Sequence, residues 1–144
     1  MIESDTIKLL RECDAGIKMG VSSIEDVRPQ VRSDSLERIL TESVENHRRL
    51  GREIEEMLHR FEDDGKNPNP MAKGMSKVKT NFKMAMNHTD NTVADLMTDG
   101  CNMGIKTLSR YLNEYAAADE KSKDIAKKLI KIEEDLAVAL RDYL

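Results

Sequence analysis

"CDAGIKMGVSSIEDV" at residues 13–27 and "CNMGIKTLSRYLNEY" at residues 101–115 share the pattern Cys-x-x-Gly-Ile-Lys at a spacing of 88 residues. The aliphatic residues Ile24 and Leu112 occupy the same later position in the two copies. At a spacing of 89, the segments that follow also match in their apolar positions: Leu36, Leu40, Ser43, His47, Leu50 and Ile54 align with Ile125, Leu129, Ile132, Leu136, Ala139 and Tyr143. The alternative is chance similarity between amphipathic helices. Taken as a repeat, the pattern predicts two copies of one helical hairpin.

The composition is typical of an all-helical protein. Charged residues make up 35% of the 144 residues and hydrophobic residues 39%, whereas aromatic residues make up only 3%. β-rich domains depend on Val, Thr and aromatic residues, and the aromatic residues are scarce here. The net charge of -4 gives no indication of a nucleic-acid partner.

The amino-terminal sequence "MIESDTIKLL" lacks the basic and apolar regions of a signal peptide. No apolar run reaches the roughly 18 residues that a transmembrane helix needs. Two Cys in such a chain indicate reduced thiols rather than a disulfide framework. We therefore expect a cytoplasmic protein without a transmembrane segment.

Apolar residues that recur at steps of three and four predict four long helices. They cover about residues 4–27, 34–62, 90–116 and 119–143. Pro29 ends the first helix, and "DDGKNPNP" at 63–70 ends the second. A shorter helix is predicted over about residues 71–86.

The connections are short within each pair of long helices and long between the pairs, so neighbouring helices should pack antiparallel. Two hairpins joined by a long crossover form the ferritin-like arrangement of a four-helix bundle. We expect residues 1–144 to form a single ferritin-like antiparallel bundle.

The segments "DAGIKMG" and "NMGIKTL" resemble those that open the two metal-bearing helices of rubrerythrin-type ferritin-like proteins. The chain is also similar to small bacterial ferritin-like families of unknown function. This resemblance implies a di-iron site made of a Glu from each first helix and a Glu-x-x-His from each second helix.

The sequence departs from that pattern at most of the implied ligand positions. In the order of the chain they hold Ile17, Val44, His47, Ile105, Glu133 and Leu136. Only His47 and Glu133 keep the implied ligand type. The apolar side chains at the other four positions would fill the centre of the bundle as part of its core. We therefore expect a non-catalytic binding or structural protein with a degenerate metal site, not an enzyme, and without a cofactor. The alternative is an active metalloprotein, an iron or manganese oxidase or peroxidase with an altered carboxylate/Cys/His site.

Cys13, Asp14, His47, Cys101 and Glu133 are the weak metal-ligand candidates of this alternative. Buried free Cys usually acts as a small hydrophobic residue, the alternatives being a redox pair or a metal site. His47 reads as a core histidine with a hydrogen-bond partner. We expect Asp14 to pair with His47 or with an Arg of the second helix.

The segment "MAKGMSKVKTNFKMAM" at 71–86 combines four Met with four Lys and contains no acid. It is either a crossover helix that packs on the bundle or a surface for a protein partner or a membrane. The candidate partner-binding residues are Lys73, Lys77, Lys79 and Lys83.

Glycines recur inside the first helix of each hairpin, at positions 16, 20, 100 and 104. Because Gly costs a helix about 1 kcal/mol relative to Ala, we expect close backbone contact there. The contact would lie between these two helices or across a dimer interface. The family resemblance also makes a homodimer the expected assembly.

Overall fold

The computed structural model describes residues 2–68 and 89–144 and contains four long helices there. They are α1 (Ile2–Val27), α2 (Asp34–Arg60), α4 (Asp90–Glu114) and α5 (Glu120–Leu140). Short 3₁₀ helices follow α1 and α5, at Arg28–Gln30 and Arg141–Tyr143. No strand occurs in these two ranges, which confirms the all-helical class. The helix predicted at 71–86, with its four lysines, lies outside the described residues.

Side-chain caps fix where three of the helices begin. Ser33, Thr89 and Asp119 precede α2, α4 and α5, and each side chain accepts a hydrogen bond from the backbone three residues later, at Leu36, Thr92 and Ser122. Such caps satisfy amide groups that have no partner inside the helix. At the other end, Pro29 stops α1 at Val27, as predicted.

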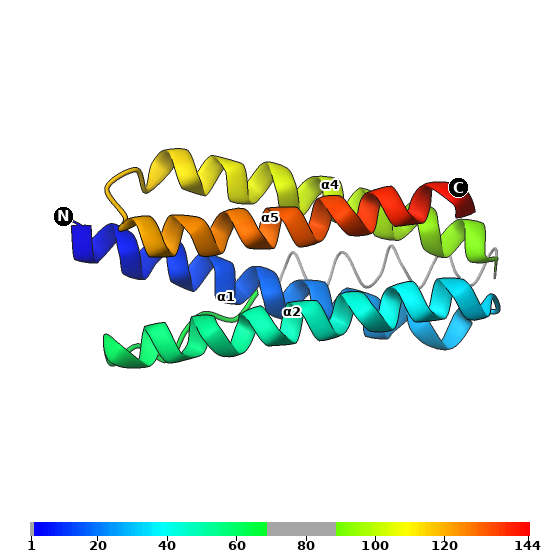
Figure 1. Ribbon diagram of the computed structural model, residues 1–144, viewed down its shortest axis with the longest axis horizontal. Coiled ribbons are helices and arrows are strands. Elements are labelled where there is room, and N and C mark those ends of the chain that lie inside the picture. The colour runs from blue at the N-terminus through cyan, green and yellow to red at the C-terminus, as the bar shows by residue number, and fades with distance from the viewer. Residues whose placement is uncertain (1, 69–88) are drawn as a thin grey trace.

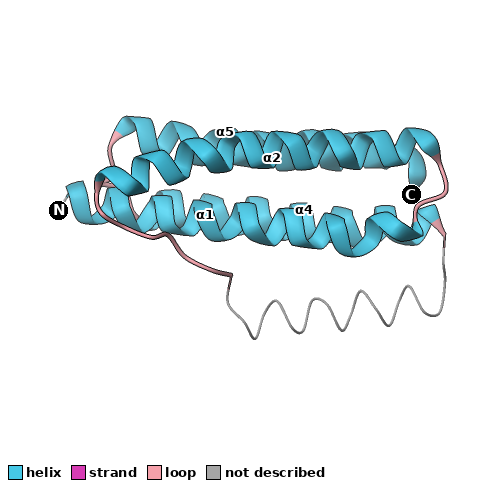
Figure 2. Cartoon of the chain, turned by 90° about the horizontal axis from the view of Figure 1, so that it is seen from below, coloured by secondary structure: helices cyan, strands magenta, loops and turns pink. Residues whose placement is uncertain are grey.

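The helices form a bundle in which each contacts two neighbours side by side. Helix α1 lies against α2 and α4, and α5 lies against the same two helices, while α1 and α5 also touch across the diagonal. All four neighbouring pairs run antiparallel (Figure 1). Helices α2 and α4 run in the same direction, so the connection between them joins opposite ends of the bundle (Figures 1 and 2).

The apolar core consists of two clusters, one towards each end of the bundle. The first contains Leu9, Leu10, Cys13, Ile17, Leu50, Ile54, Met57, Leu58, Leu108, Ala118, Ile125, Ala126 and Leu129. The second contains Ile24, Val27, Leu36, Leu40, Val44, Val93, Ala94, Leu96, Met97, Cys101, Leu136 and Leu140. Partly buried Val21 packs against both clusters. Each long helix contributes residues from one part of its length to the first cluster and from the other part to the second.

Hydrogen bonds to loop backbone tie the two hairpins together at both ends. The Asp90 carboxylate at the start of α4 accepts from the amides of Arg32 and Ser33, both at 2.9 Å. At the opposite end, the Thr6 hydroxyl of α1 accepts from the Asp119 amide at 2.9 Å.

None of the described helices is both long and apolar enough to cross a lipid bilayer.

Candidate functional site

A polar layer separates the two apolar clusters at the middle of the bundle. It contains Gly20 of α1, His47 of α2, Gly104 of α4 and Glu133 of α5, so all four helices contribute. His47 is 0% exposed and Glu133 is 8% exposed. A charged side chain this deep in a protein requires a specific partner, and the layer supplies one.

His47 and Glu133 are hydrogen-bonded to each other across α2 and α5. The Nε2 atom of His47 lies 2.6 Å from Oε1 of Glu133, and its Nδ1 atom lies 2.7 Å from the carbonyl oxygen of Ser43. The carbonyl oxygen can only accept, so Nδ1 carries a proton and donates it. Nε2 can donate the second ring proton to the carboxylate, which makes the pair complete without any further group.

Opposing effects act on the protonation of His47. Burial lowers the pKa of the imidazole, whereas the hydrogen bond and charge of Glu133 and the Ser43 carbonyl raise it. The net result is a His47 pKa above its ordinary value of 6.5. The pair is therefore best described as an imidazolium–carboxylate ion pair, a charge-assisted hydrogen bond in a nearly water-free layer.

Two of the four helix glycines make room for this pair. A Cβ atom at Gly20 would lie 2.7 Å from Nε2 of His47, and one at Gly104 would lie 3.6 Å from Oε2 of Glu133. A Cβ at Gly16 would touch Leu129 at 3.4 Å, and one at Gly100 would meet nothing within 4 Å among the described residues. The predicted backbone contact between the two first helices is wrong, because side chains of α2 and α5 occupy the space.

The two cysteines are free and lie in different apolar clusters. Burial raises the pKa of Cys13 to about 12, with smaller contributions from Glu12 and Asp14. Burial also raises the pKa of Cys101, with smaller contributions from the nearby Glu133. Cys101 thus lies near the His47–Glu133 pair, whereas Cys13 packs in the first cluster away from it.

Asp14 takes no part in the polar layer. Its carboxylate lies 2.8 Å from Nζ of Lys18 and accepts a hydrogen bond from the Lys66 amide at 2.9 Å. The prediction that Asp14 pairs with His47 or with an Arg of the second helix is therefore wrong. Asp14 lies on the flank of α1 that meets the loop after α2, and this loop is its partner.

The apolar residues at the other implied ligand positions are not all in the core. Ile17, Val44 and Leu136 are buried and belong to the two clusters. Ile105 is only half-buried and belongs to neither cluster. The expectation that both isoleucines fill the centre thus holds for Ile17 and is wrong for Ile105. Cys101, Gly104 and Leu108 take the inward positions on this part of α4.

The donor set at the centre does not fit a di-iron site. Iron ions require several hard oxygen donors, and the polar layer offers one carboxylate, already paired with a histidine. Within residues 2–68 and 89–144, no three or more His, Cys, Asp or Glu side chains are grouped so that they could hold a metal ion.

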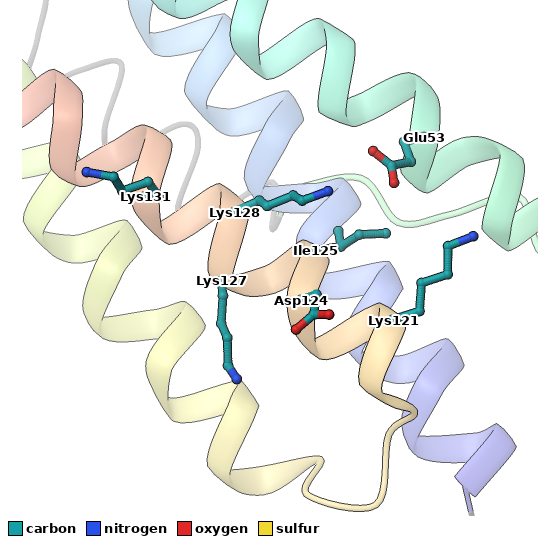
Figure 3. A pocket seen from close by; sticks show the side chains of 7 residues that line it. All are labelled: Glu53, Lys121, Asp124, Ile125, Lys127, Lys128 and Lys131. Atoms are coloured by element: carbon teal, nitrogen blue, oxygen red, sulfur yellow. The ribbon is translucent and has the colours of Figure 1, made fainter.

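An open groove on the surface between α2 and α5 was missed by the sequence analysis. It is lined by Glu53, Lys121, Asp124, Ile125, Lys127, Lys128 and Lys131. In Figure 3, Lys121 extends past the groove on the α2 side, whereas Lys127 and Lys131 point away from it. None of the lining residues is a His, Cys or Ser. The lysine spacing in "KSKDIAKKLIK" at 121–131 was the available signal.

The fold and its centre thus define an all-helical four-helix bundle with a closed polar layer. Comparison with models of known protein families, with curated proteins and with solved structures finds no match for this chain.

Proposed function

We propose that this protein is a non-catalytic ferritin-like bundle with a binding or structural role, in which an internal ion pair has replaced a di-iron site. The topology supports the ferritin-like assignment, because two antiparallel hairpins are joined by a connection between opposite ends of the bundle. The free, buried thiols support a cytoplasmic location.

The observation that carries the proposal is the 2.6 Å contact between His47 and Glu133. In a metal centre, the positive charge of the ions neutralises buried carboxylates. Here the protonated imidazole provides that neutralisation, and the Ser43 carbonyl accepts the other ring proton. A metal ion would have to displace a well-placed proton and would find a single carboxylate. The centre therefore serves the stability of the bundle.

Metal analysis of the purified protein tests the proposal. The protein is prepared without chelators, incubated separately with Fe²⁺, Mn²⁺ and Zn²⁺ under reducing conditions, desalted and analysed by mass spectrometry of the elements. We expect substoichiometric metal in each case. A stoichiometric metal content that disappears in the double variant His47→Leu/Glu133→Leu would overturn the proposal.

The second candidate function, a metalloprotein with an altered carboxylate/Cys/His site, is favoured by one observation. Glu133 is hydrogen-bonded to His47 and lies near Cys101, so α2, α4 and α5 bring a histidine, a carboxylate and a thiol towards one place. Co²⁺ is a suitable probe because thiolate ligation to cobalt gives a strong absorption band. A band that is present in the wild type and absent in Cys101→Ala would favour this candidate over the first.

The assembly and the partners are part of the same proposal. A homodimer is proposed from the family resemblance, and sedimentation velocity over a range of protein concentrations measures it directly. The lysines at 73, 77, 79 and 83 remain the proposed partner-binding residues. If this segment binds membranes, replacing all four lysines with Gln should weaken salt-sensitive binding of the protein to anionic lipid vesicles.

A further inference from the structure

Residues 61–68, which follow α2 and which we call the strap, turn back along α1 (Figures 1 and 2). The reversal begins at the end of α2, where the amides of Glu62 and Asp63 donate to the carbonyls of His59 and Leu58 at 2.9 and 3.0 Å. Glu62 has a φ of 56°, the left-handed conformation found after many helices. The end of α2 thus directs the chain back towards the middle of the bundle.

Three successive contacts hold the strap along one stripe of α1. Asp63 lies 3.7 Å from Arg11, the Lys66 amide donates to Asp14 at 2.9 Å, and Lys18 donates to the Asn67 side chain at 3.4 Å. The α1 partners Arg11, Asp14 and Lys18 are three and four residues apart, so they lie on the same face of the helix. Strap and helix therefore run in the same direction and in register.

Asp14 is the central contact of the three. Asp14 is only 3% exposed, and its carboxylate accepts hydrogen bonds from both the Lys66 amide and the Lys18 ammonium group. A buried carboxylate without such partners would destabilise the fold. The Lys66 side chain also forms an ion pair with Glu12, on the other flank of α1. Lys66 thus holds the helix on both sides.

Gly65 allows the strap to approach Asp14 this closely. It has a φ of 87°, and its amide donates to the Asp63 side chain at 2.8 Å in a tight turn. A Cβ atom there would collide with the Asp14 carboxylate, lying 3.1 Å from its Cγ atom. Glycine is therefore required for conformation and for space.

We propose that Asp14 and Gly65 form a latch that fixes the strap to α1 and determines the path by which the chain leaves α2. Helices α2 and α4 lie on a diagonal of the bundle, so the connection between them has to pass either α1 or α5. The contacts of the latch are all with α1. The latch contacts are polar and lie beside the apolar clusters, whereas Phe61 at the start of the strap packs against the first cluster. Opening the latch therefore separates residues 63–67 from α1 without unfolding the helices.

Limited proteolysis with a protease that cleaves before Asp tests the latch. The strap contains Asp63 and Asp64, and no other acidic residue occurs between Gly65 and Thr89. Cleavage at the strap can therefore be separated by mass from cleavage at Asp124, which lies on α5 and reports opening of the bundle. The variants are Asp14→Ala and Gly65→Ala.

Matched controls exist for both variants. Asp135→Ala removes the ion pair between Lys131 and Asp135, whose atoms lie 2.7 Å apart on the exposed face of α5. Its two residues are four positions apart, as are Asp14 and Lys18. Gly100→Ala adds a Cβ atom in a helix where the described residues leave open space. Neither control should alter cleavage of the strap.

We expect cleavage before Asp63 or Asp64 to become about tenfold faster in both latch variants. Asp14→Ala removes the charge-assisted hydrogen bond to the Lys66 amide, and Gly65→Ala places a side chain on a residue with a positive φ. Cleavage at Asp124 should stay at the wild-type rate. An unchanged strap rate would overturn the proposal. An equal acceleration at the strap and at Asp124 would also overturn it, because Asp14 would then stabilise the whole bundle rather than the strap.

Discussion

His47 and Glu133 are 86 residues apart in the sequence, and their side chains meet at 2.6 Å in the centre of the bundle. The contact joins the second helix of one hairpin to the second helix of the other. A polar pair in an apolar interior is satisfied in only one alignment of the helices, so we propose that this pair sets the register in which the hairpins dock. The apolar clusters on either side supply most of the burial.

Removing one member of the pair should destabilise the protein strongly. His47→Leu leaves the Glu133 carboxylate buried without its partner, at a cost of roughly 3–5 kcal/mol in the free energy of unfolding. Urea unfolding followed by circular dichroism measures this change. A loss below about 1 kcal/mol would mean that water reaches the carboxylate.

The double variant His47→Leu/Glu133→Leu should recover much of that stability. With both charges removed, no desolvated ion remains, and leucines can join the two clusters into one core. We expect the double variant to be more stable than His47→Leu alone, and a double-mutant cycle gives the coupling energy. The proposed register role predicts that its amide spectrum is less well dispersed than that of the wild type. An equally sharp spectrum would contradict that role.

The ion pair should make the stability depend on pH in a defined direction. Since the folded state raises the pKa of His47 above 6.5, it binds the imidazole proton more tightly than the unfolded state. This stabilisation is fully present below the unfolded value of 6.5 and is lost as pH rises through the folded value. Urea midpoints of the wild type should therefore fall across this range relative to those of His47→Leu. His59→Gln, which removes an exposed histidine, is the control and should keep the wild-type profile.

Gly20→Ala should destabilise the protein although alanine is the better helix former. The new methyl group would lie 2.7 Å from Nε2 and 2.8 Å from Cδ2 of His47, so the ring or the helix must move. Overpacking of this kind costs about 1–3 kcal/mol. Gly100→Ala adds the same atom at a position where no described residue lies within 4 Å, and should instead be neutral or stabilising by up to about 1 kcal/mol. Equal effects of the two substitutions in thermal unfolding would contradict the described packing.

The sequence pattern predicted the helices better than it predicted their centre. Steps of three and four between apolar residues, together with Pro29, placed the four long helices to within a few residues of the observed ends. Periodicity reports which face of a helix is buried. It does not report which of several inward residues reaches the central axis of the bundle. For that reason Ile105 was predicted to lie in the centre, whereas it lies at the edge of the buried face of its helix.

The hydrogen-bond partners of the buried polar residues could not be predicted from the sequence pattern either. His47 was interpreted as a core histidine, and both His47 and Glu133 as implied ligand positions that keep their ligand type, but their direct contact depends on how the two hairpins dock. Asp14 was assigned a partner in the second helix, whereas its partner is the backbone of Lys66. A loop that folds back on a helix offers amide groups whose positions depend on the turn before it, here on Gly65 and its positive φ.

The native protein should show two thiols that react very slowly with a disulfide reagent. Cys13 is 0% exposed and Cys101 is 2% exposed, and burial raises the pKa of each. With a pKa of about 12, Cys13 would be a thiolate in roughly one molecule in ten thousand at pH 8. In urea both thiols should react completely and at the rate of an unstructured peptide. The single-cysteine variants Cys13→Ala and Cys101→Ala assign each reaction to its residue. One thiol that reacts rapidly in the native state would show that its cluster opens to solvent, and a value below two thiols in urea would show that the cysteines are oxidised.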